Sequence, residues 1–443
     1  MSLLKRLEGG QSIDNTPQGG KKKVEDPFVE LKARVQNGVI SDLEIDLEEL
    51  SNDFSKHRGA IEGLIAKYLA KESLNLTMTQ RDRIQAELMD EITGFGPITS
   101  LINDPEVNEI MVNGPNQIYV ERSGLLYRTD TRFNDDNHVL HVIKKIVSPI
   151  GRRIDESSPM VDARLPNGSR VNAIIPPLAL NGPTLTIRKF SDNPFKVEDL
   201  VRFGTLTAKM AEVIRFCIEG RLNVVVSGGT GSGKTTTLNV LSSFIPNNER
   251  IVTIEDAAEL KLFQDHVVRL ETRPSNVEGR GEVSIRDLVK NSLRMRPDRI
   301  VVGEVRSGEA LDMLQAMNTG HDGSLTTGHA NSPRDMLSRL ETMVLMSGMQ
   351  LPVKAIRDQV ASALDLIIQQ SRLQDGSRKI THITEVHGME GDVIILQDVF
   401  RYEQTGLDQK GKVTGQFVFT GVKPRFVEKL KHHGIDIPMS LFN

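Results

Sequence analysis

The chain has 443 residues, of which 38% are hydrophobic and 26% are charged, so it has the composition of a globular protein and the length for several domains. The chain has a net charge of −4, no tryptophan and only four tyrosines. This composition argues against a protein whose whole surface binds nucleic acid. The single cysteine, Cys217, excludes an internal disulfide framework and a four-cysteine zinc site, and its apolar neighbours in the sequence indicate a buried residue.

The N-terminal sequence predicts a tail rather than a targeting segment. No apolar run approaches the roughly 18 residues of a membrane-spanning helix, and the first residues contain no apolar signal core. We therefore expect a protein of the cytosol. Residues 1–24 carry five basic against two acidic side chains and two glycine pairs, which predicts a flexible basic tail. Such a tail is either solvated or in contact with an anionic membrane surface.

Residues 25–100 have the apolar spacing of helices, as in Ile84, Leu88 and Ile92. Thr79 precedes one of these helical patterns and is a candidate helix start. The segment ends at residues 94–97, where two glycines and a proline interrupt any helix. We predict a small helical N-terminal domain with no chemistry of its own.

Residues 101–190 predict an α+β domain with a mostly antiparallel sheet. Short segments with β-forming residues alternate with Asn-Gly and Ser-Gly turns, and one helix is expected at 139–147. The expected strands cover 107–112, 117–121, 125–129, 171–175 and 184–189. This domain also carries an arginine cluster, formed by Arg152, Arg153, Arg164, Arg170 and Arg188.

Residues 191–200 form a linker to a larger domain at 201–443. There, apolar strands alternate with amphipathic helices, which indicates a parallel α/β sheet. Ser284 and Ser332 are expected to cap two of the helices, and Gly320 is expected to end the helix that starts near Gly308. From residue 365 onward the pattern predicts a few strands and then a short helix at 424–433.

Residues 222–237 contain the motif on which the functional prediction rests. The apolar run at 222–226 predicts a buried strand, and a glycine-rich loop with the spacing G-x-x-x-x-G-K-[ST] follows it. Glycines let consecutive N–H groups converge on a polyphosphate, and the helix after the loop adds its positive end. Lys234 would reach the β- and γ-phosphates, and the Thr235 hydroxyl would ligate Mg²⁺. The expected nucleotide-binding residues are Gly228, Gly229, Thr230, Gly231, Ser232, Gly233, Lys234, Thr235 and Thr236.

Carboxylates follow two further apolar strands. The strand at 250–254 ends in Glu255 and Asp256, and the strand at 298–302 is followed by Glu304. In a parallel sheet these acids face the same crevice as the phosphate loop, so one would hold Mg²⁺ while another polarises the attacking water. The sequence leaves open which of Glu255 and Glu304 is the base and which the metal holder. Asp256 either contributes to nucleotide binding or only caps the next element.

Two histidines, His321 and His329, bracket one more strand of this domain. Beside a phosphate site they are candidates to sense the γ-phosphate by hydrogen bonding. Metal binding by the pair is not expected, because no third ligand stands at a suitable spacing.

These motifs resemble those of a known family. Residues 228–235, 253–256, 302–306 and the two Thr-Gly-His sequences at 319–321 and 327–329 resemble the Walker A, Asp box, Walker B and His box of the type II/type IV secretion ATPase superfamily, which includes the GspE/PilT-like traffic ATPases. Residues 94–98, 108–114 and 161–172 resemble the CpaF/TadA branch, the ATPases of tight-adherence (Tad or Flp) pilus assembly. The single cysteine excludes the branch with a tetracysteine zinc module, and pilus retraction ATPases match less well.

The resemblance implies a fold and a site. It implies a RecA-like P-loop ATPase domain with a parallel core sheet, preceded by a PAS-like α+β sheet domain and the small helical domain. It further implies a homohexamer in which ATP and Mg²⁺ lie between the two larger domains. Arg164, Arg170 and Arg188 match the arginines that such a sheet domain supplies to the phosphates, whereas Arg294, Arg296 and Arg306 are alternatives for the subunit interface.

The resemblance also implies a function. A cytoplasmic motor, peripheral to the inner membrane of a bacterium, would dock on inner-membrane pilus platform proteins and use ATP hydrolysis to drive pilus assembly, retraction or secretion. No nucleic acid is expected as a partner. Two other classes stay open from the residues themselves, namely a hexameric nucleic-acid translocase and a nucleotide-dependent switch or scaffold with negligible turnover. Salt-dependent binding to nucleic acid would indicate the first of these, and absent phosphate release the second.

Overall fold

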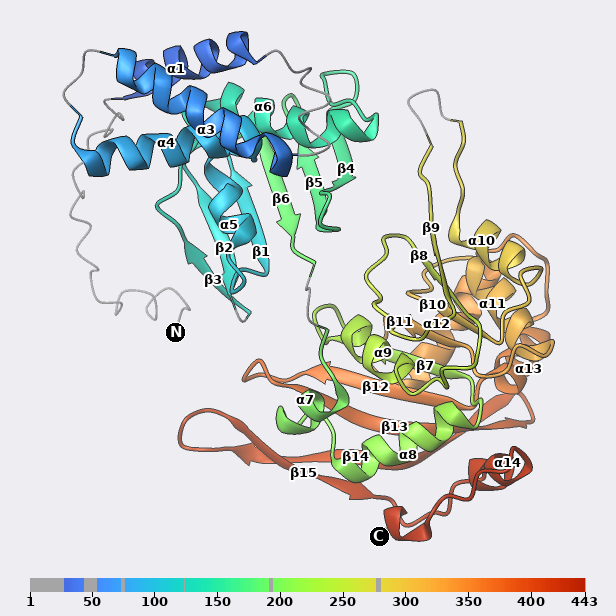
Figure 1. Ribbon diagram of the computed structural model, residues 1–443. Helices are drawn as coiled ribbons and strands as arrows, with labels where there is room; N and C mark the ends of the chain where they lie inside the picture. Colours follow the sequence, from blue (N-terminus) through green and yellow to red (C-terminus); the bar gives the residue numbers. More distant parts are fainter. Residues whose placement is uncertain are drawn as a thin grey trace, which may run out of the picture. The chain divides into compact units, whose positions relative to one another are not determined.

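A computed structural model describes residues 28–43, 54–72, 76–122, 124–190, 194–275 and 280–442 (Figure 1). The basic tail predicted at 1–24 lies outside these residues. The chain divides into two compact units. The first comprises Met1–Val120, Arg128–Ala163 and Asn172–Thr186, and the second comprises Glu121–Tyr127, Arg164–Val171 and Ile187–Asn443. Within the described ranges, no helix combines the length and hydrophobicity that crossing a bilayer requires.

Three helices in the first unit pack on one another, namely α1 (Val29–Asp42), α3 (Phe54–Lys71) and α4 (Met78–Thr93). Apolar residues spaced by three and four give each helix one buried face. The shared core contains Leu31, Val35, Val39, Ile61, Ile65, Leu69, Ile84, Leu88 and Ile92. Helix α4 starts slightly before the position suggested by Thr79, because Thr77 and Gln80 form a capping box there.

A six-stranded sheet has the order β3-β2-β1-β6-β5-β4. Its strands are β1 (Glu109–Asn113), β2 (Ile118–Arg122), β3 (Leu125–Arg128), β4 (Met160–Arg164), β5 (Arg170–Ile174) and β6 (Thr184–Arg188). Helix α5 (Thr99–Asn103) precedes the sheet, and α6 (Asp136–Val147) covers the predicted helical segment. Strand β4 was not expected; it is an edge strand without a buried residue, and its sequence, Met-Val-Asp-Ala-Arg, has no run of β-branched or aromatic residues.

A nine-stranded sheet in the second unit has the order β15-β14-β13-β12-β7-β11-β10-β8-β9. The six strands from β12 to β9 run parallel, whereas β12, β13, β14 and β15 pair antiparallel in succession. The strands are β7 (Val224–Gly228), β8 (Ile251–Glu255), β9 (Val267–Glu271), β10 (Arg299–Val302), β11 (Leu325–Gly328), β12 (Leu366–Arg372), β13 (Arg378–Glu390), β14 (Val393–Leu407) and β15 (Val413–Phe419). The parallel sheet predicted from the alternating pattern is therefore present.

Helices precede β7, follow β7, β9, β10 and β11, and end the chain after β15. They are α7 (Val197–Arg202), α8 (Ala208–Glu219), α9 (Lys234–Ser242), α10 (Ile285–Ser292), α11 (Glu309–Asn318), α12 (Pro333–Leu345), α13 (Val353–Ala363) and α14 (Phe426–His432). Ser284 and Ser332 cap α10 and α12 as predicted, and Gly320 follows the end of α11 with a positive φ of 94°.

Two apolar cores belong to this sheet. One gathers residues of α8, α9 and α14 with β7 and β12, and the other gathers α10 to α13 with β8 and β10. Cys217 on α8 is fully buried in the first core, and this burial raises the pKa of its thiol well above the usual value. The prediction of a buried cysteine is confirmed.

A buried ion pair ties the amino end of β10 to the segment before β8. The guanidinium of Arg299 is fully buried and donates to Glu249 and, over 3.3 Å, to the carbonyl oxygen of Gly323. Glu249 also accepts a hydrogen bond of 3.1 Å from Arg221. Each charge of the cluster is therefore compensated by hydrogen-bonded partners.

Replacing Arg299 by alanine is expected to lower the free energy of unfolding by about 3–5 kcal/mol, because the buried carboxylate of Glu249 loses its main partner. Urea unfolding followed by circular dichroism measures the change. The control is Arg202→Ala, since Arg202 forms an exposed pair with Asp199 on α7 and should contribute less than about 1 kcal/mol. Equal losses for the two variants would contradict the structural role of Arg299.

Candidate functional site

The phosphate loop lies between β7 and α9 and has the backbone that its sequence predicts. Every residue of β7 is buried, and Gly231 and Gly233 have left-handed φ angles of 71° and 96°. At Gly228 a Cβ would lie 2.2 Å from the carbonyl oxygen of Gln370 on β12, so only glycine fits between these strands. Such a loop presents N–H groups rather than side chains to an anion, and α9 begins directly at its end.

Lys234, the first residue of α9, turns its amine back over the loop. Its Nζ donates to the carbonyl oxygen of Gly229 over 3.1 Å and lies 3.2 Å from Nδ1 of His329. Burial lowers the pKa of Lys234, and the nearby Glu304 carboxylate opposes this shift. The amine is thus a desolvated cation beside the phosphate loop, where an anionic ligand would be bound strongly.

Glu304 lies just after β10 and is held by two neighbours. Its Oε1 lies 2.7 Å from Nε2 of His329, and its Oε2 accepts a 2.8 Å hydrogen bond from Nε of Arg306. Burial, followed by the charge of Lys234, lowers the pKa of His329. In a neutral imidazole with its proton on Nε2, Nδ1 can accept from Lys234.

Glu255, the last residue of β8, has a different environment. Its side chain is buried, and Oε2 accepts backbone hydrogen bonds of 2.8 Å from Glu259 and 3.1 Å from Leu260. Oε1 is buried without a hydrogen-bond partner among the described residues. Burial raises the pKa of Glu255 to about 7, although the two backbone N–H groups oppose the shift. This carboxyl group can exchange a proton near neutral pH.

The order of the strands explains why these groups converge. Strands β7, β11, β10 and β8 are consecutive parallel neighbours, so their carboxyl ends lie along one edge of the sheet. They deliver the phosphate loop, His329, Glu304 and Glu255 in that order. Asp256 follows Glu255, and its Oδ2 lies 3.6 Å from Nη1 of Arg306, which connects it to the Glu304 side of the site.

The donor set at this edge fits Mg²⁺ bound together with phosphates. In nucleotide sites this cation keeps several waters and needs only one or two oxygen ligands from the protein. The Thr235 hydroxyl and a carboxylate provide such ligands. Within the part of the chain that the structure describes, no three His, Cys, Asp or Glu side chains form a cluster that would hold a metal alone.

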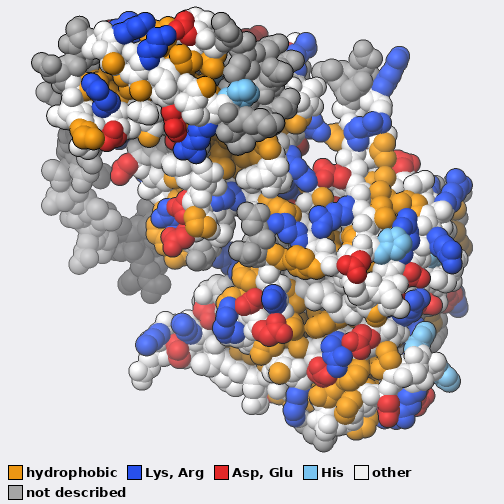
Figure 2. Space-filling model, in the orientation of Figure 1, with side chains coloured by type: hydrophobic (Ala, Val, Ile, Leu, Met, Phe, Trp, Pro, Cys, Tyr) orange, Lys and Arg blue, Asp and Glu red, His pale blue; other side chains and the backbone are white. Residues whose placement is uncertain are grey.

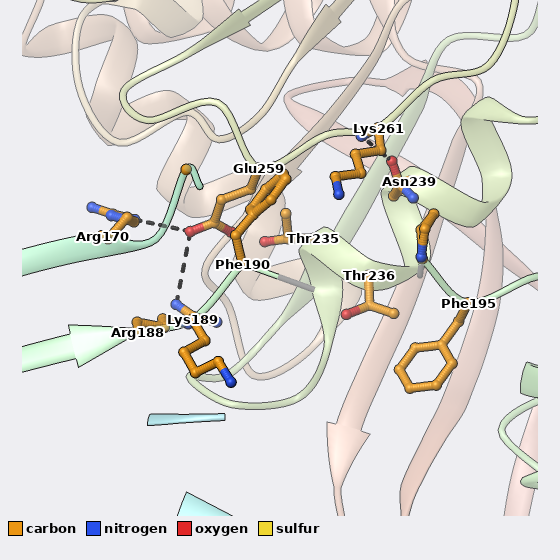
Figure 3. Close-up of a pocket in the computed structure, with 12 residues that line it drawn as sticks. Arg170, Arg188, Lys189, Phe190, Phe195, Thr235, Thr236, Asn239, Glu259 and Lys261 are labelled. Atoms are coloured by element: carbon orange, nitrogen blue, oxygen red, sulfur yellow. Dashed lines mark hydrogen bonds and ion pairs between the residues drawn. The ribbon is translucent and has the colours of Figure 1, made fainter. Parts of the chain in front are cut away.

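The three predicted arginines contact acidic side chains near Glu255. Arg170 lies 3.0 Å and Arg188 3.9 Å from Oε1 of Glu259 (Figure 3). Arg164 lies 3.1 Å from Oε2 of Glu271. Glu259 is the residue whose N–H binds Glu255. Arg170 and Arg188 therefore contact a residue that binds Glu255 directly, whereas Arg164 contacts Glu271, the register partner of Glu255 on β9.

A cavity of about 160 Å³ opens beside the first turns of α9. Figure 3 shows Phe190, Phe195 and Lys261 around it, together with Thr235, Thr236 and Asn239 of α9. The ammonium group of Lys261 lies 4.3 Å from the centre of the Phe190 ring. The cavity is smaller than a typical pocket for a whole small-molecule ligand, so it suits one part of a ligand.

The two predicted histidines are at opposite ends of β11. His329 follows the strand and contacts the site, whereas His321 precedes it, and its carbonyl oxygen accepts a hydrogen bond from Ser324. Ser324 in turn is bonded to Asn223, just before β7. Within this chain the contacts bring only His329 to the phosphate loop, so a shared sensing role finds no support in this geometry.

Two residues on β12 and β13 were not expected at the loop. Gln370 pairs with Gly228 across the ladder and accepts a 2.6 Å hydrogen bond from Thr237 of α9, and Arg378 donates to the carbonyl oxygen of Gly231 over 3.0 Å. Gln370 is polar and stands near the end of an apolar strand, the same signal that identified Glu255 and Glu304. Arg378 carries no such signal, because it reaches the loop only through the β12–β13 pairing.

Several known proteins are similar to this chain in sequence. Residues 91–405 match the family described as Type II/IV secretion system protein. A Mycobacterium tuberculosis protein named for conjugal transfer is 36% identical over 312 residues, which cover 69% of this chain and 88% of that protein. The type IV secretion system protein VirB11 of Brucella suis is 31% identical over 318 residues, which cover 66% of this chain and 88% of VirB11.

Solved structures also match this chain. The VirB11 ATPase from the Brucella suis type IV secretion system, in complex with sulphate, matches with a TM-score of 0.36 and 29% identity, covering 65% of this chain and 94% of that one. The Legionella pneumophila ATPase DotB matches with a TM-score of 0.47 and 21% identity, covering 66% of this chain and 80% of DotB.

Proposed function

Since this chain belongs to the Type II/IV secretion system protein family, we propose that it is an ATPase that converts ATP hydrolysis into mechanical work on a secretion or pilus machine. The observation that supports this most directly is the convergence at one sheet edge of the phosphate loop, Lys234, His329, Glu304 and Glu255. A switch that only binds nucleotide needs the loop but does not need two further carboxylates, Glu255 and Glu304, beside it.

The two glutamates differ in ways that suggest separate roles. Glu255 is buried, and its raised pKa suits a general base that accepts the proton of the attacking water. Glu304 contacts Arg306 and His329 and is suited to hold Mg²⁺ through water, with the Thr235 hydroxyl as the second ligand. When bound, Mg²⁺ would neutralise charge on the phosphates. Lys234 would neutralise charge from the other side.

The pH dependence of turnover follows from the role of Glu255. A base with a raised pKa is active only when ionised, so kcat should rise with pH through an apparent pKa of about 7 and fall about tenfold per pH unit below it. Steady-state phosphate release at saturating Mg-ATP between pH 5.5 and 8.5 measures this profile. A flat profile over that range would exclude Glu255 as the base.

The CpaF/TadA branch gives the finer proposal. It rests on the motifs at residues 94–98, 108–114 and 161–172, and it makes the chain a homohexameric motor of Tad pilus assembly, peripheral to the inner membrane through platform proteins. In this proposal the chain consists of a basic tail (1–24), a helical domain (25–100), an α+β sheet domain (101–190), a linker (191–200) and the ATPase domain (201–443). Arg164, Arg170 and Arg188 would then serve the phosphates of the bound nucleotide.

A second candidate function is a motor for conjugation or protein secretion. It is favoured by relatives named for conjugal transfer and type IV secretion, which are 31–36% identical to this chain. A nucleic-acid translocase has less support, because such proteins carry a basic stripe. Figure 2 shows basic and acidic side chains interspersed over the visible face, in agreement with the net charge of −4.

The experiment that tests the proposed function is ATP turnover as a function of protein concentration, with the oligomer mass measured in parallel. Turnover should increase as a hexamer forms, and it should be lost in Arg164→Ala or Arg170→Ala. Arg401→Ala is the control, since Arg401 pairs with Glu403 on β14 outside the site. Full turnover in a monomer would contradict a ring motor, and no phosphate release from any assembly would contradict the ATPase itself.

A further inference from the structure

Two arginines face each other across the hairpin that joins β12 and β13. Arg372 and Arg378 are register partners at the end of the antiparallel ladder, and both side chains are exposed. Like charges directly opposite each other on neighbouring strands destabilise a sheet unless a counter-charge lies between them. In the described parts of the chain, neither guanidinium forms an ion pair.

The acid nearest to them in sequence does not neutralise them. Asp375 lies in the turn between the strands, and its Oδ1 accepts hydrogen bonds from the N–H and hydroxyl of Ser377. Its Oδ2 accepts the N–H of Val413 over 2.9 Å. The Ser377 hydroxyl, together with these N–H groups, lowers the pKa of Asp375 to about 2. Both carboxylate oxygens are thus bound to groups other than the arginines.

The hairpin directs this pair toward the phosphate loop. Nε of Arg378 donates to the Gly231 carbonyl oxygen over 3.0 Å, and a Cβ at Gly231 would lie 3.9 Å from Nη1 of Arg372. At Gly233 a Cβ would lie 3.2 Å from Cδ of Arg378. Arg372 and Arg378, two cations without an acidic partner among the described residues, therefore lie next to Gly231 and Gly233 of the phosphate loop.

We propose that Arg372 and Arg378 form a second phosphate-binding element that contacts the polyphosphate of the nucleotide held at Gly228–Thr235. The pair approaches from the β12–β13 side of the loop, whereas Lys234 acts from α9. This rests on the proposed function, because the nucleotide is its ligand. Charge-assisted contacts between guanidinium and phosphate make the pair a determinant of affinity. The anion also removes the repulsion between the two strands.

The test uses inorganic tripolyphosphate and ATP, each titrated with Mg²⁺ into the full chain by calorimetry. Arg372→Ala and Arg378→Ala should each bind both ligands about 10- to 100-fold more weakly than the wild type. Arg401→Ala, which removes an exposed arginine from the same sheet, should bind as the wild type does. Unchanged affinity for tripolyphosphate would overturn the proposal. A loss of affinity for ATP but not for tripolyphosphate would also overturn it, since the two arginines would then contact the base or the ribose instead of the phosphates.

Arg372→Glu separates ligand binding from support of the loop. The new carboxylate would lie opposite Arg378 and form a cross-strand ion pair, so the melting temperature without ligand should stay equal or rise. The affinity for tripolyphosphate should fall at least as far as in Arg372→Ala. A parallel loss of melting temperature and affinity would indicate a structural role instead. If the wild type binds both ligands through this pair but releases no phosphate, the ATPase function fails while the phosphate-binding pair remains.

Discussion

Replacing Glu255 by glutamine should lower ATP turnover by about 10²- to 10⁴-fold, the range that a positioned general base contributes. The fold should survive, because the amide oxygen can still accept the N–H groups of Glu259 and Leu260. The charge lost is small near neutral pH, where the pKa of about 7 already leaves this carboxyl half protonated. Single-turnover phosphate release measures the effect, and the affinity for nucleotide should change little.

Glu304→Gln is the matched comparison for this variant. It replaces the carboxylate that contacts Arg306 and His329 with a neutral amide, which binds Mg²⁺ more weakly. The variant should therefore need more Mg²⁺ for turnover, and added Mg²⁺ should partly restore its turnover. Glu255→Gln should not respond to added Mg²⁺. If Glu304→Gln alone abolished turnover at every Mg²⁺ concentration while Glu255→Gln remained active, the two roles would have to be exchanged.

Replacing Lys234 by alanine should make turnover undetectable and abolish the rise in melting temperature that ATP produces in the wild type. The buried amine of Lys234 lies against the loop, where it contacts the Gly229 carbonyl oxygen and His329, and alanine leaves no positive charge in its place. Thermal unfolding with and without Mg-ATP, together with phosphate release, measures both effects.

The same variant should be well folded without ligand. Burial lowers the pKa of Lys234, which means that the buried charge destabilises the folded chain. Removing the charge should therefore not lower the free energy of unfolding. Lys410→Ala, at an exposed lysine in the β14–β15 turn, is the control and should leave ATP stabilisation intact. ATP-dependent stabilisation of Lys234→Ala equal to that of the wild type would contradict the site.

Much of the site could be predicted because its signals are local. The loop at 228–235 is continuous in sequence, and Glu255 and Glu304 each end or follow an apolar strand. A parallel sheet brings such ends to one edge whatever the order of its strands. This general property made the convergence predictable, although the order β7-β11-β10-β8 was not.

The remaining features depend on pairing that a single sequence does not display. Arg378 reaches Gly231 because of two strand pairings. Strand β13 pairs antiparallel with β12, and β12 pairs with β7, the strand that leads into the phosphate loop. The sequence places His321 and His329 at the two ends of one strand, and the contacts of the folded chain bring only His329 to Lys234. The contacts of Arg164 and Arg170 with Glu271 and Glu259 likewise join segments about a hundred residues apart.

The buried thiol on α8 makes this chain convenient for site-specific labelling. Cys217 is the only cysteine, it is fully shielded from solvent, and its raised pKa keeps it from forming the reactive thiolate. A maleimide dye or spin label should therefore leave the native protein unmodified. One new cysteine at an exposed turn position such as Gln409 would then carry the only probe, so distances between neighbouring copies could be followed during ATP turnover without first removing a native residue.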